Sequence, residues 1–189
     1  EASSSNDSLF SVAADENGKW TVSANNAFST THSLTVVVDG QTYEIVVTDA
    51  NVCVVKNGTS EAEYGTLQGA IDTANNGDTI VLKDNVTESV TIDAGKTITI
   101  DLNGKTLTNE NGKHTIINKG TLTIIDSVGT GVVDNVSHGC GALVNTGTAI
   151  LDGGTFTRSK ENGTTSGANG NSWYVIKNVG TMTINEGVT

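Results

Sequence analysis

Short runs of alternating hydrophobic and polar residues dominate this chain, and one of them returns several times. The runs "TITI" (97–100), "TLTI" (121–124), "TAIL" (148–151) and "TMTI" (181–184) align on their first threonine. Alternation sends successive side chains to opposite faces of a strand. The threonines therefore share one face. The other face takes two hydrophobic columns: Ile98, Leu122, Ala149 and Met182, and then Ile100, Ile124, Leu151 and Ile184.

The intervals between these runs predict how the strands are arranged. Their first threonines, at positions 97, 121, 148 and 181, are separated by 24, 27 and 33 residues. Unequal returns of this kind are typical of a solenoid whose connecting loops vary in length. A second similarity, between "LNGKTLT" (102–108) and "LDGGTFT" (151–157), indicates more than one strand in each repeat. Because no helical pattern separates these strands, we predict an all-β fold, a parallel β-helix.

An asparagine and a glycine precede three of the runs, as in "NKGTLTI", "NTGTAIL" and "NVGTMTI". In stacked parallel strands, each residue lies about 4.8 Å from its equivalent in the next strand. We therefore predict a ladder of hydrogen-bonded amides formed by Asn118, Asn145 and Asn178. The glycines are expected to permit a tight or left-handed turn, at Gly120, Gly147 and Gly180. The repeated asparagine and glycine are then structural and do not form a ligand site.

The pattern changes near residue 50, which predicts two domains. Residues 1–50 contain two hairpin patterns, around Asn17-Gly18 and around Asp39-Gly40, and predict a small antiparallel β unit. Its expected buried face consists of Val36, Val38, Tyr43, Ile45 and Val47. Residues 51–189 are assigned to the parallel β-helix. We expect the natural protein to continue with further repeats or a cap, so that this domain is truncated at its C-terminal end.

One segment, "TLQGAIDTANNG" (66–77), has a helical pattern. Its hydrophobic residues, spaced as one face of a short helix, are Leu67, Ala70, Ile71 and Ala74. Thr66 is expected to cap the start of this helix, and Asn76-Gly77 to close its end in a left-handed conformation.

The segment around this helix carries a resemblance to a known family. Residues 63–107, "EYGTLQGAIDTANNGDTIVLKDNVTESVTIDAGKTITIDLNGKTL", resemble the entry of right-handed parallel β-helices of the pectate-lyase-like superfold. They are most similar to those in large surface proteins of gut Gram-positive bacteria. The resemblance implies that the helix plugs the N-terminal end of the β-helix and that the protein is extracellular, on a bacterial cell surface or secreted. The superfold hosts lyases, hydrolases and adhesins, so it does not fix an activity.

Charge narrows the range of partners. The net charge of -11 argues against nucleic acid and anionic membrane surfaces, which bind clustered Lys and Arg. Polyanionic polysaccharides would also be repelled unless a divalent cation bridged them. No hydrophobic run approaches the roughly 18 residues of a membrane span, so we expect no membrane insertion. Cys53 and Cys140 are interpreted as inert thiols, with a disulfide as the alternative.

Carboxylates after the repeated run offer an alternative, enzymatic interpretation. Asp101, Asp126 and Asp152 follow that run, and an enzyme of this superfold would gather such groups on one side. Calcium is the one cofactor that this alternative would use. The offsets from the repeat threonine are irregular, and Asp is common at turns for backbone reasons. We therefore assign no catalytic or metal-binding residue.

The most promising binding segment is the longest insertion, "RSKENGTTSGANGNSWY" (158–174), which is polar and rich in glycine. Loops on a rigid scaffold often carry recognition. The candidate binding residues are Arg158, Lys160, Glu161, Trp173 and Tyr174.

Together with the resemblance, these patterns predict recognition or adhesion rather than catalysis. The resemblance implies that the partner is a host glycan, a mucin or a secreted host protein. The resemblance adds immunoglobulin as one such protein, because some related gut surface proteins bind it. The alternative function is a polysaccharide lyase or glycoside hydrolase of the same superfold.

Overall fold

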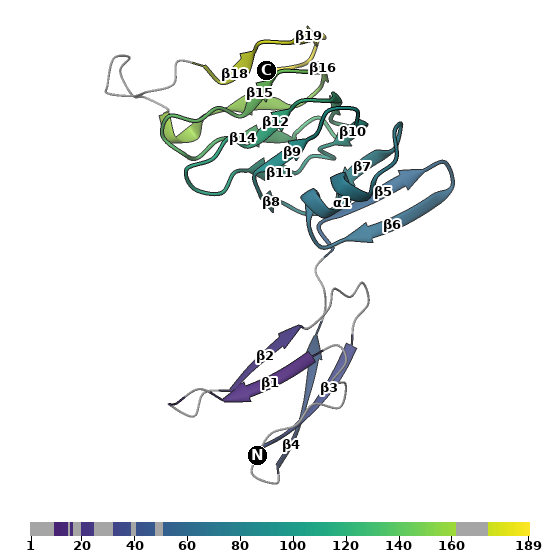
Figure 1. The fold of residues 1–189 in the computed structure, drawn as a ribbon, viewed down its shortest axis with the longest axis vertical. Helices are drawn as coiled ribbons and strands as arrows, with labels where there is room; N and C mark the ends of the chain where they lie inside the picture. The colour runs from purple at the N-terminus through teal and green to yellow at the C-terminus, as the bar shows by residue number, and fades with distance from the viewer. Residues whose placement is uncertain are drawn as a thin grey trace. The chain divides into compact units, whose positions relative to one another are not determined.

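The protein is mostly β with parallel sheets. The computed structural model describes residues 10–14, 16, 20–24, 32–38, 41–47, 51–161 and 174–189. By its internal contacts the chain separates into two compact units, Glu1–Ala50 and Asn51–Thr189. Among the described residues there is one α-helix, and the remaining regular structure is almost entirely strand (Figure 1).

The first unit consists of two antiparallel pairs. Strand β1 (Phe10–Ala14) pairs with β2 (Trp20–Ala24), and β3 (His32–Val38) pairs with β4 (Gln41–Val47). The predicted turn residues Asn17-Gly18 and Asp39-Gly40 lie outside the described residues.

The core of the first unit corrects the predicted buried face. Phe10, Leu34 and Val36 are buried, with Val12 and Val22 packed against them. Tyr43 and Ile45 are exposed, although they pair with Val36 and Leu34. The reason is that the hydrophobic side chains of β1 and β2 cover β3 and not β4. The side chains of Val38 and Val47 are not described.

The second unit begins with a hairpin and a helix and continues with short strands. The hairpin consists of β5 (Cys53–Asn57) and β6 (Ser60–Tyr64), and the helix is α1 (Leu67–Thr73). The strands that follow are β7 (Thr79–Leu82), β8 (Val86–Thr87), β9 (Val90–Ile92), β10 (Thr97–Asp101), β11 (Thr106–Thr108), β12 (Ile116–Asn118), β13 (Thr121–Ile125), β14 (Val132–Asp134), β15 (Leu143–Asn145), β16 (Thr148–Asp152), β17 (Thr155–Thr157), β18 (Ile176–Asn178) and β19 (Thr181–Ile184). A 3-10 turn, η1 (Ser159–Glu161), follows β17.

These strands form three sheets, which the chain visits in a fixed order. The first sheet has the strand order β19-β16-β13-β10-β7-β5-β6, the second β17-β14-β11-β8 and the third β18-β15-β12-β9. From β7 onward, each strand belongs to the sheet after that of its predecessor, and every pairing among these strands is parallel. Each sheet therefore gains one strand each time the chain returns.

The register agrees with the alignment of the repeated runs. Thr97, Thr121, Thr148 and Thr181 occupy equivalent positions in the first sheet. The predicted inward columns are buried in β10, β13 and β16, where Leu122 and Ile124 are fully inaccessible. Met182 is only half-buried and Ile184 is 57% exposed, because β19 is the outermost strand and is covered on one side by β16 alone.

The repeated asparagine forms a line of amide hydrogen bonds in the third sheet. Asn118 Nδ2 donates to Asn145 Oδ1, and Asn145 Nδ2 donates to Asn178 Oδ1, both at 2.7 Å. Asn118 and Asn145 are fully buried, whereas Asn178 is exposed. At the start of the line, Asn118 stacks on Ile92, and its Oδ1 accepts instead from the backbone N–H of Gly120.

The repeated glycine has a different cause from the predicted one. Gly120, Gly147 and Gly180 are not among the residues with positive φ, so a left-handed turn is not what they provide. A Cβ atom on Gly147 would lie 2.1 Å from the Gly120 carbonyl oxygen, and one on Gly180 would lie 2.0 Å from that of Gly147. Glycine is required here because stacked backbones approach too closely for any side chain.

Helix α1 packs its predicted hydrophobic face on the core and caps strand edges. Leu67, Ala70 and Ile71 are buried in the main cluster. The Gln68 amide exchanges two hydrogen bonds with the backbone of Thr91 in β9, accepting at 2.8 Å and donating at 3.1 Å. The Glu88 carboxylate accepts from the first two N–H groups of the helix, and Thr66 caps its start as predicted. With seven residues α1 is too short to cross a membrane, and the described residues hold no other helix that could.

Two local features differ from the prediction or were missed by it. The helix ends at Thr73, and Ala74 is extended with φ −57° and ψ 138°. Gly77, with φ +95°, serves the turn into β7 rather than the helix end. The β5–β6 hairpin, whose two-residue turn is Gly58-Thr59, was not predicted, although a glycine at the first turn position is a known hairpin signal and Gly58 has φ +57°.

Candidate functional site

Two of the predicted binding residues, Arg158 and Tyr174, contact neighbouring positions of the chain. Arg158 is 9% exposed, and its Nε donates to the Cys140 carbonyl at 2.7 Å. Tyr174 is half-buried, and its ring lies so close to Gly141 that a Cβ atom there would be 3.1 Å from two ring carbons. Arg158 and Tyr174 thus meet at the same short segment, Cys140 and Gly141.

The other predicted binding residues are described only in part. Lys160 is exposed on η1, and Glu161 ends that turn. The side chain of Glu161 and all of Trp173 lie outside the described residues.

The three carboxylates of the enzymatic alternative accept hydrogen bonds from the protein itself. Asp101 Oδ1 accepts from the backbone N–H of Asn103 at 2.8 Å and of Ser127 at 3.0 Å. Asp152 Oδ1 accepts from the Asn185 amide at 2.9 Å. Within the described part of the chain, no group of three or more His, Cys, Asp or Glu side chains is arranged to hold a metal ion.

Asp126 is the most strongly bound of the three. Its Oδ1 accepts from Gly104 N–H at 2.8 Å and its Oδ2 from Gly131 N–H at 2.6 Å. Burial raises the pKa of Asp126, but the backbone N–H donors outweigh it and leave the pKa below its usual value. The carboxylate stabilises the loop after β13.

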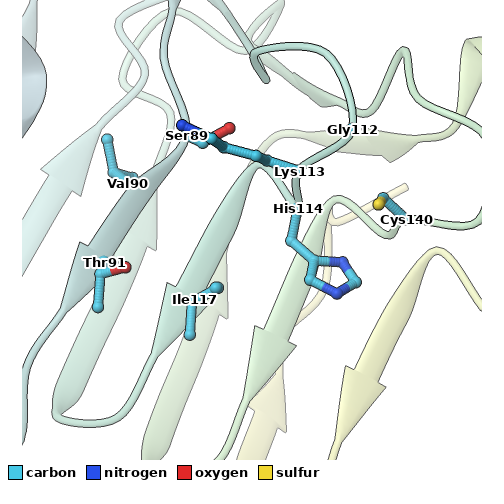
Figure 2. A pocket seen from close by; sticks show the side chains of 8 residues that line it. All are labelled: Ser89, Val90, Thr91, Gly112, Lys113, His114, Ile117 and Cys140. Carbon is cyan, nitrogen blue, oxygen red and sulfur yellow. The ribbon is translucent and has the colours of Figure 1, made fainter.

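A hollow lies on the outer face of the third sheet. It has a volume of about 380 Å³. Figure 2 shows side chains from β9, from β12 and from the segment that leads into β12 around it. Its lining residues are Ser89, Val90, Thr91, Gly112, Lys113, His114, Ile117 and Cys140. We call the space that these residues enclose the outer hollow.

The strand register positions an outward row of side chains, of which Thr91 and Ile117 line the outer hollow. Thr91, Ile117, Val144 and Lys177 occupy equivalent positions on β9, β12, β15 and β18. Because their neighbours along each strand, such as Ile116 and Leu143, are buried in the core, alternation turns this row outward. Ile117 and Val144 are half-buried, so the row presents a partly hydrophobic surface bordered by polar groups.

His114 is fixed in one orientation at the edge of the outer hollow. The Gly141 N–H donates to His114 Nδ1 at 2.9 Å, so the neutral ring carries its proton on Nε2. Burial lowers the pKa of His114, and the positive charge of Lys177 lowers it further. The described residues offer Nε2 no partner, which leaves an N–H donor available to a ligand.

Two lysines complete the surroundings of the outer hollow. The Lys113 ammonium pairs with the Glu110 carboxylate. The Lys177 ammonium lies 5.7 Å from the centre of the Tyr174 ring.

Cys53 and Cys140 are both free thiols. Cys53 is buried, which raises its pKa to about 12, with the charge of Glu88 adding to the effect.

The sequence did not reveal the outer hollow, because its residues come from segments without a shared motif. The available signal was the alternation around Thr91 and Ile117, which assigns both to an outward face once the third sheet is known. In comparisons with known proteins, no family model, no curated protein and no solved structure matches the chain.

Proposed function

We propose that this chain is a non-catalytic recognition or adhesion segment of a bacterial protein that is exposed on the cell surface or secreted. Its partner is a host glycan or a host protein. Residues 51–189 act as the scaffold, a right-handed parallel β-helix in which each return of the chain adds one strand to every sheet. The observation that carries the proposal is the outer hollow, which combines a floor of paired strands with hydrogen-bond donors that have no partner in the described part of the chain.

The scaffold supports this function through its regularity. From β7 to β19 the chain visits the three sheets in the order first, second, third, without exception, and these strands pair in parallel. Connections between parallel strands are right-handed in nearly all proteins, which favours a right-handed path. Stacked strands hold outward side chains at fixed spacing, so a ligand meets a preorganised surface.

The carboxylates favour binding over catalysis. Glycoside hydrolysis and uronate elimination need carboxylates or a metal aimed at the substrate. Asp101, Asp126 and Asp152 instead accept hydrogen bonds from the chain itself. We therefore keep the lyase or hydrolase as the outcome that the experiment must exclude.

The test combines binding with turnover. The full 189-residue chain is applied to a glycan array and used to capture partners from intestinal secretions, and the bound glycans are then incubated with it. We expect saturable binding without new reducing ends or unsaturated products. Release of either product would contradict the non-catalytic assignment, and a complete lack of binding to glycans and secreted proteins would contradict recognition.

A further inference from the structure

The outer hollow differs in charge from the rest of the chain. The chain carries 21 Asp and Glu against 10 Lys and Arg. Among the described residues, the lining of the outer hollow contains no carboxylate, and it includes Lys113 and His114. Lys177 is close enough to influence the pKa of His114. A single anionic group is therefore tolerated here, whereas a long polyanion would meet the negative surface around it.

The chemistry of the lining matches a sugar ring. Ile117 offers a hydrophobic contact of the kind that a face of C–H groups needs. The hydroxyl of Thr91 has no partner among the described residues, and His114 Nε2–H is likewise available. Ser89 Oγ accepts from Glu110 N–H at 3.1 Å, which leaves its own proton to donate. Few polar groups around a partly hydrophobic floor are typical of small-ligand sites.

Size and charge together limit the ligand to one acidic unit. A volume of about 380 Å³ is near the lower end of ligand sites. The Lys113 side chain is 61% exposed and its ammonium is paired with the Glu110 carboxylate, so it can turn to an incoming anion.

We propose that the outer hollow binds a single acidic sugar unit, such as a hexuronic or sialic acid at the end of a glycan. The sugar ring lies on Ile117, its hydroxyl groups bond Thr91 and His114 Nε2–H, and its carboxylate binds Lys113. This inference rests on the proposed recognition function and specifies the ligand of the same scaffold.

The experiment is an NMR titration of the full chain with four probes. They are methyl glucuronoside, methyl sialoside, methyl glucoside and acetate. Glucuronoside and glucoside differ by the carboxylate alone, and acetate supplies the carboxylate without the ring. We expect the Thr91 amide and the His114 ring to shift with at least one acidic sugar, at roughly tenfold higher affinity than with glucoside or acetate, the effect of one charge-assisted hydrogen bond.

Two variants and a control identify the contacts. Lys113→Gln should weaken the acidic sugar roughly tenfold and leave the glucoside unchanged. Thr91→Val should weaken acidic and neutral sugars alike. Lys83→Gln is the control, because Lys83 is also a surface lysine paired with a glutamate, Glu63, and does not line the outer hollow. It should bind as the unaltered chain does.

The outcomes separate this inference from the proposed function. Binding of one acidic sugar and not the other would identify which of the two the outer hollow recognises. Binding of both would assign acidic sugars in general. Equal affinity for the glucoside, or for acetate, would overturn the acidic-sugar assignment. So would the absence of shifts at Thr91 and His114, even if the glycan array or the capture experiment shows a different partner.

Discussion

At the scale of single residues, the repeated asparagine and glycine have separate physical roles. Asn145 is fully buried and satisfies its amide through Asn118, Asn178 and the Thr181 carbonyl. Its glycine neighbour, Gly147, is fixed by crowding between stacked backbones. The sequence predicted the first role, because a buried amide that recurs in register can be satisfied by its equivalents. It could not predict the second, because the approach of two backbones depends on the loop path.

Replacing Asn145 with leucine should lower the free energy of unfolding by roughly 1–3 kcal/mol, since the amides of Asn118 and Asn178 lose their partner. The matched control is Asn178→Leu, which should cost less because Asn178 is exposed. Urea denaturation of both variants measures the difference. An equal or larger loss for the Asn178 variant would contradict the role of the line of amides.

Replacing Gly147 with alanine should destabilise the chain more than Gly95→Ala does. Gly95 has φ +86° and open space around its Cβ position, so alanine there meets backbone strain of about 1–2 kcal/mol. At Gly147 the added methyl would overlap the Gly120 carbonyl and force the stacked strands apart. Thermal melting of the two variants ranks them, and the reverse ranking would show that the backbones do not approach so closely.

Protonation of His114 should destabilise the fold. Because its folded pKa is lower than the ordinary value of 6.5, the unfolded chain binds the proton more readily. The stabilising contribution is complete above that value and is lost as the pH falls through the folded pKa. An NMR titration of the ring should give a midpoint below 6.5, and the advantage of the unaltered chain over His114→Phe should shrink between pH 7.5 and pH 5. A midpoint at or above 6.5 would refute this.

At the scale of elements, helix α1 is stabilised by its contacts with the strands and in turn satisfies backbone groups of β9. A seven-residue helix is too short to be stable alone. Its stripe of Leu67, Ala70 and Ile71 predicted a buried face correctly. The contacts that Gln68 and Glu88 make could not be predicted, because they join the helix to strands about 20 residues away. Through Gln68, α1 satisfies backbone groups at the outer edge of β9, which would otherwise invite pairing with another strand.

Replacing Gln68 with alanine should therefore cost about 1–2 kcal/mol of stability and expose the edge of β9. The stability of Gln68→Glu should lie between that of the unaltered chain and that of the alanine variant. The glutamate keeps an acceptor for the Thr91 N–H but loses the donor to the Thr91 carbonyl. Amide hydrogen exchange reports the local effect. Unchanged protection of the Thr91 amide in the alanine variant would mean that Gln68 does not cap this strand.

At the scale of the whole molecule, the sequence predicted the order of strands better than it predicted the surface. The returning runs specified the first sheet and its register. The second and third sheets were harder to foresee, because strands such as Val86–Thr87 are too short to carry an alternating pattern. The outer hollow was missed because its lining residues come from segments without a shared motif. Tyr43 and Ile45 were assigned to a core, because alternation identifies a shared face but not whether another element covers it.

The central claim is that successive returns of the chain stack directly, residue upon equivalent residue, and so build the surface proposed for recognition. Methyl-to-methyl nuclear Overhauser contacts in a selectively labelled sample test it most directly. Equivalent side chains on stacked strands lie about 4.8 Å apart. We predict strong contacts from Leu122 to Ile98 and Ala149, and from Leu143 to Ile116 and Ile176. Absence of these contacts, or stronger ones from Leu122 to Ile100, would contradict the register and the stacked architecture.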